Sequence, residues 1–231
     1  MKLSAKDHTS RIFDGELTHL HCLVLEMAAL VIDQLDQSLK ALHERDPQLA
    51  ENVILRDREV DDHEIKIDST VLTIIAKRSP VAIDLRLVMS VSKMVVDLEL
   101  IGDEVVKISQ LIISLFDNGS SDPNQQLLRD IVKMGEMISS MLKQVIQSFD
   151  NCDLAGAYTL LNEKWDYGEE FQAGIRRQLT FVIENPRIMS RSMNIFQIMK
   201  SLERCGDHCR NINEYLIFIF EGKNIRHQIE D

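Results

Sequence analysis

The chain has 231 residues, and its 26 lysines and arginines against 37 aspartates and glutamates give a formal net charge of −11 at pH 7. This acidity argues against nucleic acid or an anionic membrane surface as the main partner, because both carry negative charge. Hydrophobic residues make up 45% of the chain, which is enough for a substantial core and excludes a disordered protein.

Six long helices are expected to account for most of the chain, and strand signals are almost absent. The expected spans are 16–44, 47–77, 80–117, 122–150, 153–184 and 186–221. Each of the four prolines follows a residue that commonly caps a helix, which predicts a helix start at each of them. The four pairs are Asp46-Pro47, Ser79-Pro80, Asp122-Pro123 and Asn185-Pro186.

Apolar residues recur within these segments at alternating steps of three and four, a pattern typical of antiparallel helical bundles. In the third segment the apolar stripe is Leu87, Val91, Met94, Leu98, Ile101, Val105, Ile108 and Ile112. The polar stretch NGSSDP, which begins at Asn118, interrupts this pattern and indicates a linker. We therefore expect two domains, residues 1–117 and residues 118–231.

One motif occurs twice: LELIGDEVVKI in the first half is matched by SLERCGDHCRNI in the second. Glu99 and Asp103 correspond to Glu203 and Asp207, which lie 203 − 99 = 104 residues further on. A glycine lies between the two acids each time, although glycine costs a helix interior about 0.5–1 kcal/mol relative to alanine. The duplication predicts an all-α fold of two tandem, symmetry-related antiparallel three-helix bundles, and the glycine predicts close approach by another helix or a ligand.

The acids of this motif are expected to face away from the apolar stripe of their own helix, because residues four apart share one helix face. The helix 47–77 carries a further acidic stripe, formed by Asp57, Asp61, Glu64 and Asp68. Aligned carboxylates repel one another and destabilise a bare helix, so a cation would relieve them. All-oxygen ligands suit magnesium, calcium, manganese or iron, and a stripe without histidine or cysteine makes a closed zinc site less expected.

The second half carries a thinner version of this pattern. Its last helix presents Glu203, Asp207, Asn211 and Glu214, and the candidate companions on the preceding helix are Glu163, Asp166 and Glu170. An ordinary solvated surface of an acidic protein is the alternative interpretation of both stripes. A carboxylate-ligated metal-binding or metal-storage helical protein is the alternative function.

The other candidate sites have weaker support in the sequence. Cys205 and Cys209 fall on the apolar side of their helix, which indicates buried structural cysteines. A ferritin-like di-iron enzyme needs two Glu-x-x-His pairs, whereas one occurs, at Glu16 and His19. No phosphate-binding loop, nucleophile elbow or zinc-protease motif is found, so we expect no enzyme. The lack of a disulfide framework, of an apolar leader and of a run of about twenty apolar residues favours the cytosol.

Four segments give the chain a resemblance to a known family. AKRSPVAIDLRLV (76–88) and ELIGDEVVKI (99–108) resemble the Pro-x-x-x-Asp-Leu-Arg and Glu-Arg-Ile-Gly-Asp elements of the PhoU family of phosphate-signalling regulators. RQLTFVIENPR (177–187) and LERCGDHCRNINEYLIFIFEGKNIRH (202–227) resemble the matching elements and the closing segment in the second half. The resemblance covers nearly the whole chain.

The resemblance implies a cytoplasmic accessory protein, not an enzyme, that associates with the inner membrane peripherally through its partners and does not insert into it. The implied partners are the ATPase subunit of a phosphate ABC transporter, a phosphate sensor histidine kinase and a second copy of the chain in a homodimer. PhoU-like proteins hold the phosphate-starvation response off when phosphate is plentiful, and some restrain phosphate uptake. We therefore expect a negative regulator of phosphate metabolism that binds no nucleic acid.

The resemblance also implies metals. Some PhoU-like proteins carry iron or zinc clusters on their Glu/Asp-x-x-x-Asp motifs, and others are found with magnesium or manganese. Carried over to this sequence, the metal positions are Asp57, Asp61, Glu99, Asp103, Glu203 and Asp207. Three positions depart from the family pattern. Leu100 replaces the arginine usual after the first motif glutamate, Gly168 falls near where an acid is expected, and Cys205 stands at the usual isoleucine.

Overall fold

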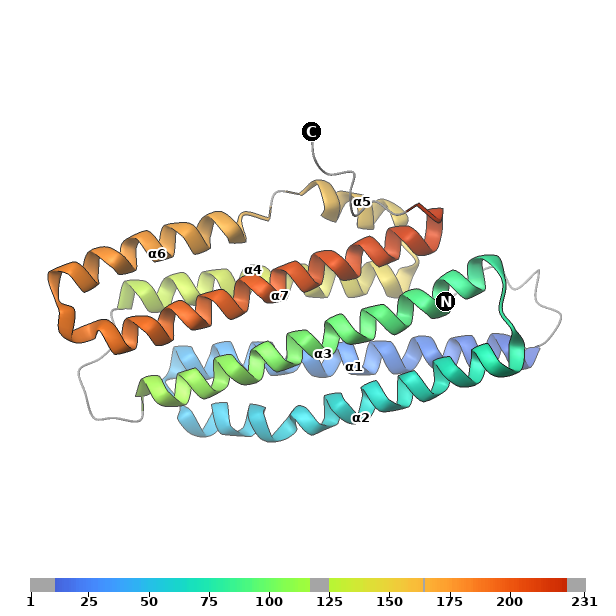
Figure 1. The fold of residues 1–231 in the computed structure, drawn as a ribbon, viewed down its shortest axis with the longest axis horizontal. Helices are drawn as coiled ribbons and strands as arrows, with labels where there is room; N and C mark the ends of the chain where they lie inside the picture. Colours follow the sequence, from blue (N-terminus) through green and yellow to red (C-terminus); the bar gives the residue numbers. More distant parts are fainter. Residues whose placement is uncertain (1–10, 117–124, 164, 224–231) are drawn as a thin grey trace.

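The structure is a computed structural model that describes residues 11–116, 125–163 and 165–223. Its elements are α1 (Arg11–Glu44), α2 (Pro47–Arg78), α3 (Ala82–Phe116), α4 (Gln125–Asn151), α5 (Leu154–Asn162), α6 (Tyr167–Glu184), the 3-10 helix η1 (Pro186–Ile188) and α7 (Met189–Glu221). These described residues contain no strand. The expected all-α class is confirmed (Figure 1).

Two bundles make up the fold. The first repeat consists of α1, α2 and α3, and the second repeat consists of α4, α7 and the pair α5 and α6 (Figure 1). The two repeats are joined chiefly along α3 and α7, which make the most extensive contact in the structure, and α1 also contacts α4. The buried apolar side chains form one cluster that runs through both repeats. The predicted boundary between residues 117 and 118 lies outside the described residues, so the division into two domains stays a prediction.

Two of the helix starts predicted from cap–proline pairs lie at the ends of α2, and one of them is confirmed while the other is wrong. Asp46 caps the start of α2 as predicted, because its Oδ1 accepts from the backbone N–H of Gln48 at 2.9 Å and of Leu49 at 3.2 Å. The helix start predicted at Ser79 is wrong. Ser79 lies in the left-handed region (φ 46°) and ends α2, and α3 begins at Ala82.

The other two proline signals concern the second repeat. Asn185 accepts from the backbone N–H of Arg187 at 3.2 Å and so begins η1, while α7 follows from Met189. The start predicted at Asp122-Pro123 lies outside the described residues.

The single helix predicted over 153–184 is wrong, because the chain leaves the helical conformation between α5 and α6. Glu163 is extended (φ −69°, ψ 127°) and ends α5, and Asp166 occupies the position that precedes α6. The break lets Trp165 pack against the core and lets Tyr167, which is 2% exposed, bury its ring against α7. Aromatic burial offsets the helical hydrogen bonds lost at the break. No proline marks the break, so the apolar pattern alone did not reveal it.

α1 is the core helix of the first repeat. Within the described ranges it is the one helix long and apolar enough to cross a membrane, which the count of uninterrupted apolar residues had not suggested. Its apolar side chains are used inside the protein, since Leu20, Val24, Met27 and Val31 are at most 1% exposed. α1 contacts α2, α3 and α4, so core packing accounts for its apolar character.

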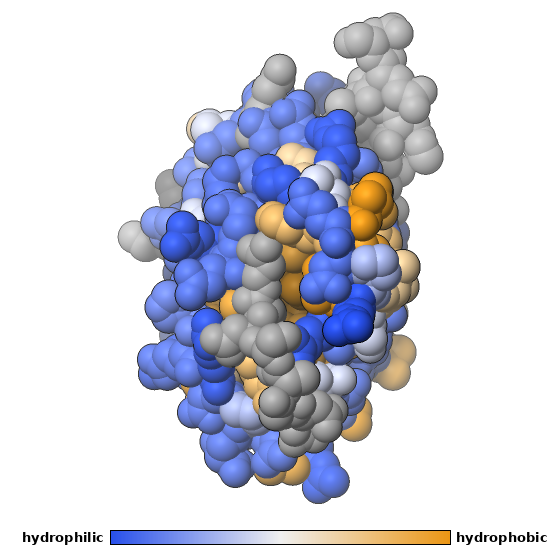
Figure 2. All heavy atoms as spheres, turned by 90° about the vertical axis from the view of Figure 1, so that its left-hand side faces the viewer, coloured by the Kyte–Doolittle hydropathy of each residue, from blue (hydrophilic) through white to orange (hydrophobic). Residues whose placement is uncertain are grey.

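Apolar side chains are exposed near the α2–α3 turn and near the α6–α7 turn, which lie at opposite ends of the molecule (Figure 1). They include Leu85 and Met89 after the α2–α3 turn, and Met189 and Met193 after the α6–α7 turn. The two pairs are related by the offset of the duplicated motif, because 189 − 85 = 104. Figure 2 views the end that carries the α6–α7 turn and shows apolar patches among hydrophilic side chains.

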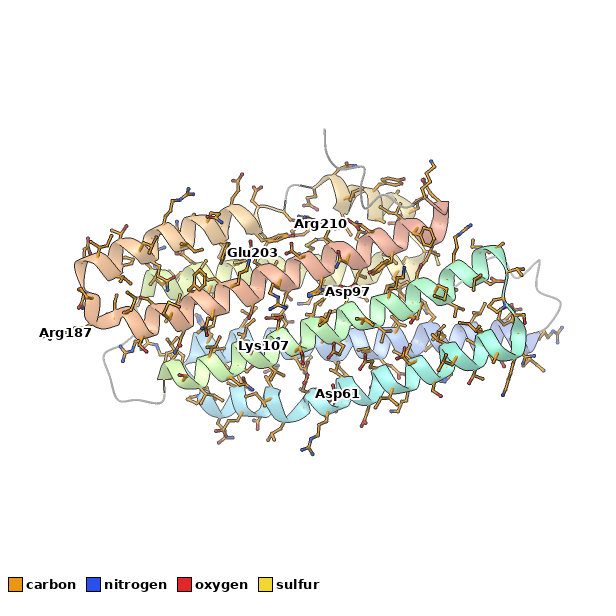
Figure 3. All side chains as sticks on the ribbon, in the orientation of Figure 1. Asp61, Asp97, Lys107, Arg187, Glu203 and Arg210 are labelled. Carbon is orange, nitrogen blue, oxygen red and sulfur yellow. The ribbon has the colours of Figure 1, made fainter. Side chains whose placement is uncertain are left out.

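Buried charges fix the position of α7 on α3. Oδ1 of Asp97, a residue 5% exposed, lies 2.6 Å from Nδ1 of His208, on the side of α3 that faces α7 (Figure 3). Glu104, which is 2% exposed, lies 2.9 Å from the guanidinium of Arg204. Because a buried charge without its partner is costly, these pairs favour one arrangement of the two repeats. Cys205, between them on α7, is fully buried as predicted.

Candidate metal centre

The acidic face of the first repeat comprises six carboxylates of α2 and α3: Asp57, Asp61, Glu64, Asp68, Glu99 and Asp103. The two helices are antiparallel neighbours, so the outward side of α3 lies beside the acidic stripe of α2 (Figure 1). All six residues are half-buried or exposed, and so they face away from the apolar core as predicted. The structure therefore brings four of the six predicted metal positions onto one surface.

Repulsion within the acidic face changes the acid–base properties of its members. Burial and then repulsion from Asp103 and Glu64 raise the pKa of Glu99 above its usual value. Burial and then repulsion from Asp68 and Asp61 raise the pKa of Glu64. Each shift means that the ionised carboxylate is disfavoured in the folded protein. The acidic face is thus electrostatically strained at neutral pH.

Little positive charge reaches this surface. In the part of the chain that the structure describes, Lys107 is the one basic side chain at ion-pair distance from the acidic face. Its Nζ lies 4.0 Å from Oδ2 of Asp103 and is nearer to the buried Glu104, at 3.1 Å. Among the described residues, most of the negative charge of the acidic face therefore has no basic partner.

Gly102 lies where α3 crosses α1 and α2, between the two acids of the motif. A β-carbon at this position would lie 3.4 Å from Oδ1 of Asp57 and 3.8 Å from Oε1 of Gln34, a residue of α1. Gln34 is 1% exposed, and neither the oxygen nor the nitrogen of its side-chain amide makes a hydrogen bond. Two oxygens from different helices thus converge on the space that the glycine leaves.

Asp57 is the carboxylate that lies deepest in this arrangement. Burial, followed by repulsion from Asp61 and Asp103, raises the pKa of Asp57. The nearby amide of Gln34 opposes this shift of the pKa most weakly of the four influences, and it does so without reaching hydrogen-bond geometry. Asp57 and Gln34 are therefore close neighbours whose mutual arrangement is not fixed by a hydrogen bond.

The residues of this region fit a hard cation. In the described ranges no three histidine, cysteine, aspartate or glutamate side chains converge into a ready-made ligand set. The orphaned amide of Gln34 and the space beside Gly102 nevertheless provide an unpaired oxygen next to Asp57. Oxygen donors and excess negative charge suit magnesium or manganese better than a closed zinc site.

In the second repeat, other side chains fill the space beside the motif glycine. A β-carbon at Gly206 would lie 2.8 Å from Cε2 of Tyr167 and 2.9 Å from Cδ1 of Ile138, so both side chains fill the space beside this glycine. Ile138 corresponds to Gln34 through the offset of the motif, because 138 − 34 = 104. The hydroxyl of Tyr167 donates to Oδ1 of Asp207 at 3.1 Å. An aromatic ring and an apolar side chain thus occupy the equivalent of the space that remains beside Gly102.

The remaining acids of the second repeat are dispersed among protein partners. Glu203 pairs with Lys200 one turn earlier on α7, and Glu170 of α6 pairs with Lys133 of α4. Glu163 and Asp166 lie at the break between α5 and α6. α7 makes no contact with α2, and Figure 3 shows Glu203 and Asp61 on opposite sides of α3. The structure therefore does not bring Glu203 and Asp207 into the acidic face, and their binding of metal stays a prediction.

Sequence reasoning missed Gln34 and the contact of Tyr167 with Asp207. A signal for Gln34 exists, since it follows Val31 by three residues and so interrupts the apolar stripe of α1 with an amide. No comparable signal identifies Tyr167, because its contact with Asp207 spans 40 residues and depends on the break before α6.

Comparison with known proteins agrees with this architecture. The sequence profile of the PhoU domain matches the chain twice, over residues 24–112 and 131–216. A phosphate-specific transport system accessory protein PhoU homolog of Pseudomonas putida is 35% identical over 226 residues, which cover 98% of this chain and 87% of that protein. The phosphate-specific transport system accessory protein PhoU of Escherichia coli K12 is 33% identical over 225 residues, covering 97% and 92%.

Two solved structures resemble the fold. The crystal structure of PhoU from Pseudomonas aeruginosa superposes with a TM-score of 0.85 at 34% identity, and covers 91% of this chain and 100% of that one. The phosphate transport system regulatory protein PhoU from Streptococcus pneumoniae superposes with a TM-score of 0.82 at 24% identity, covering 92% and 98%. The second likeness concerns the fold alone.

Proposed function

This chain belongs to the PhoU family, and on that premise we propose that it is a cytoplasmic regulator that links phosphate transport to the phosphate-starvation response. It binds the ATPase subunit of a phosphate ABC transporter and a sensor histidine kinase, and it keeps starvation genes off when phosphate is plentiful. The observation that carries this proposal is the PhoU domain that occurs twice, over residues 24–112 and 131–216. Relatives named as accessory proteins of phosphate-specific transport align with 97–98% of the chain.

Regulation of this kind proceeds by binding, not by catalysis. A bundle surface that binds the transporter differently in its transport states changes how much protein is free to bind the kinase. The exposed apolar pairs Leu85 with Met89 and Met189 with Met193 support a docking role, because exposed apolar surface commonly marks protein contacts. Their equivalence in the two repeats offers two similar ends to partners.

A cation completes this proposal. A hard divalent ion on the acidic face would neutralise carboxylates that otherwise repel one another, and it would supply electrostatic stabilisation without any reaction step. Asp57, Asp61, Glu99 and Asp103 are the residues that would hold it. The ion would thereby set the surface charge that α2 and α3 present to a partner.

Deletion of the gene tests the regulatory proposal. A reporter driven by a phosphate-starvation promoter should be active in phosphate-rich medium in the deletion strain, and the wild-type gene should restore repression. Leu85→Asp with Met89→Asp should fail to restore it if that end docks a partner, whereas an exposed polar change such as Gln147→Ala should restore it fully. Repression that persists in the deletion strain would refute the proposal.

The alternative of a metal store is decided by stoichiometry. A store would bind many ions per chain, whereas the acidic face offers room for few. Elemental analysis of protein purified without chelator or affinity metal distinguishes the two functions. Metal in large molar excess over the chain would favour storage.

A further inference from the structure

The break between α5 and α6 has no counterpart in the first repeat. α2 runs without interruption from Pro47 to Arg78, whereas the corresponding part of the second repeat is divided into two helices (Figure 1). The break brings Trp165, the only tryptophan of the chain, against the core. Within the described ranges the indole N–H of Trp165 is buried and makes no hydrogen bond. The break thus leaves a donor that the protein itself does not satisfy, which is unfavourable.

An unused acceptor lies on α7. Asn213 is 2% exposed, and its Nδ2 donates to the backbone carbonyl of Ala157 on α5 at 2.9 Å. This bond orients the amide, while Oδ1 of Asn213 is buried and accepts from no described residue. Ser109 stands at the equivalent position of the first repeat, because 213 − 109 = 104, and its hydroxyl donates to Oγ of Ser38 at 3.1 Å. The unused acceptor therefore belongs to the second repeat.

One cavity contains both unused groups. It lies between α4, α5 and α7, beside the break, and has a volume of about 360 Å³. Small-molecule sites in proteins have volumes of about 300–1,000 Å³. Apolar walls come from three side chains, Met141 of α4 with Leu160 and Leu161 of α5. A donor on Trp165 and an acceptor on Asn213 thus share one space with apolar walls.

Charged side chains complete the lining of the cavity. They are Glu163, Arg210 and Glu214. The guanidinium carbon of Arg210 lies 5.6 Å from the centroid of the Tyr167 ring, and Figure 3 shows Arg210 near the break. Arg210 opposes a bare cation, and the two carboxylates oppose a multiply charged anion. The cavity therefore favours a neutral ligand, unlike the acidic face of the first repeat.

We propose that this cavity binds a nucleoside. Nucleobases carry hydrogen-bond donors and acceptors together on the edge of a flat ring. The base would accept from the indole N–H of Trp165 and donate to Oδ1 of Asn213, and its faces would pack against the apolar walls. The hydroxyls of the sugar would reach Glu163 and Arg210, which are exposed and offer an acceptor and donors. This site lies outside the acidic face and goes beyond the proposed regulatory function.

The fluorescence of the full chain tests the proposal directly, because its tryptophan emission comes from Trp165 alone. Adenosine, guanosine, cytidine and uridine are titrated separately at pH 7, and isothermal calorimetry measures the affinity and stoichiometry. At least one nucleoside should change the emission in a saturable way and bind once per chain. The corresponding nucleoside monophosphate should bind no more tightly, because Glu163 and Glu214 repel its phosphate. Tighter binding of the monophosphate would overturn the assignment to nucleosides.

Two variants remove the two polar groups one at a time. Trp165→Phe keeps an aromatic ring and loses the N–H, and Asn213→Ala loses the acceptor. Each should weaken the calorimetric affinity about three- to tenfold, the effect of one hydrogen bond. The matched control is Asn194→Ala, which removes an amide of the same helix outside the cavity and should bind as the wild type does. Circular dichroism checks the fold, and Trp165→Phe decides the question if Asn213→Ala does not fold.

Four results would overturn the proposal. They are the absence of binding by all four nucleosides, which would leave the cavity to water; binding that does not change the emission of Trp165; unchanged affinity in Trp165→Phe; and an equal loss in Asn194→Ala. The regulatory function fails or survives separately, because it is read from the reporter in the deletion strain.

Discussion

Gly102→Ala and Gly206→Ala are expected to change the stability of the protein in opposite directions, although both replace the glycine of the same motif. In either helix, alanine gains about 0.5–1 kcal/mol over glycine. At Gly102 the new β-carbon would meet Asp57 at 3.4 Å, Val60 at 3.6 Å and Gln34 at 3.8 Å, which are ordinary contact distances. The gain is retained, so the free energy of unfolding should rise by about 0.5–1 kcal/mol.

At Gly206 the same methyl group overlaps its neighbours. It would lie 2.8 Å from Cε2 of Tyr167 and 2.9 Å from Cδ1 of Ile138. Ile138 ends in a flexible methyl, but the ring of Tyr167 is buried and its hydroxyl donates to Asp207 at 3.1 Å. Overpacking of this kind costs about 1–3 kcal/mol, and displacement of the ring forfeits a hydrogen bond of about 0.5–1.5 kcal/mol. After the gain from alanine is subtracted, the net loss of unfolding free energy should be about 0.5–4 kcal/mol.

Urea and thermal unfolding in chelator, followed by circular dichroism, measure both effects. For a chain of this size about 1 kcal/mol corresponds to roughly 2–4 °C in Tm. Tyr167→Phe provides the control, since it removes the hydroxyl and leaves the ring. Shifts of the same sign in the two glycine variants would refute the structural difference between the repeats.

Three further predictions concern charge. Glu99→Gln should raise the free energy of unfolding at pH 7 by about 0.5–1 kcal/mol, since each like-charge pair it removes costs roughly 0.2–0.5 kcal/mol. Burial, and then Asp103 and other neighbouring acids, raise the pKa of Glu99 in the folded state. The gain in stability should therefore disappear as the pH falls through that pKa towards the unfolded value. Urea titrations at pH 7 and pH 4 check this, and a variant less stable than the wild type at pH 7 would contradict it. Burial, opposed by Asp150, lowers the pKa of His21, so the folded state binds that proton less tightly than the unfolded chain. Stability should therefore fall as the pH drops below about 6.5, and His21→Leu should flatten this part of the profile. Arg204→Ala removes the cross-repeat partner of the buried Glu104 and should cost about 1.5–3 kcal/mol; an unchanged urea midpoint would show that the pair does not hold the repeats together.

The helical class and the doubling of the fold are fixed by local information. Apolar residues at steps of three and four bury themselves when the chain is helical, so the stripe from Leu87 to Ile112 is buried as a face of α3. Asp46 caps α2 because its carboxylate reaches backbone N–H groups two and three residues on. The outward position of Glu99 and Asp103 follows from the same helical period. The break before α6 escapes such reasoning, since it depends on where Trp165 finds a core to pack against.

What separates the two repeats depends on contacts between helices that are distant in the sequence. The motif acids Glu99 and Glu203 have the same spacing to their glycine and to the second acid, although Glu203 also pairs with Lys200 on its own helix. Only packing places the amide of Gln34 beneath one motif and the ring of Tyr167 beneath the other. The physical reason is that a helical period specifies which face a residue occupies, whereas the groups it meets there are set by the register between helices. The sequence therefore determined two like bundles with outward acids. The tertiary structure decided that the place beside Gly102 can take a methyl group among Asp57, Val60 and Gln34, whereas Tyr167 and Ile138 fill the place beside Gly206.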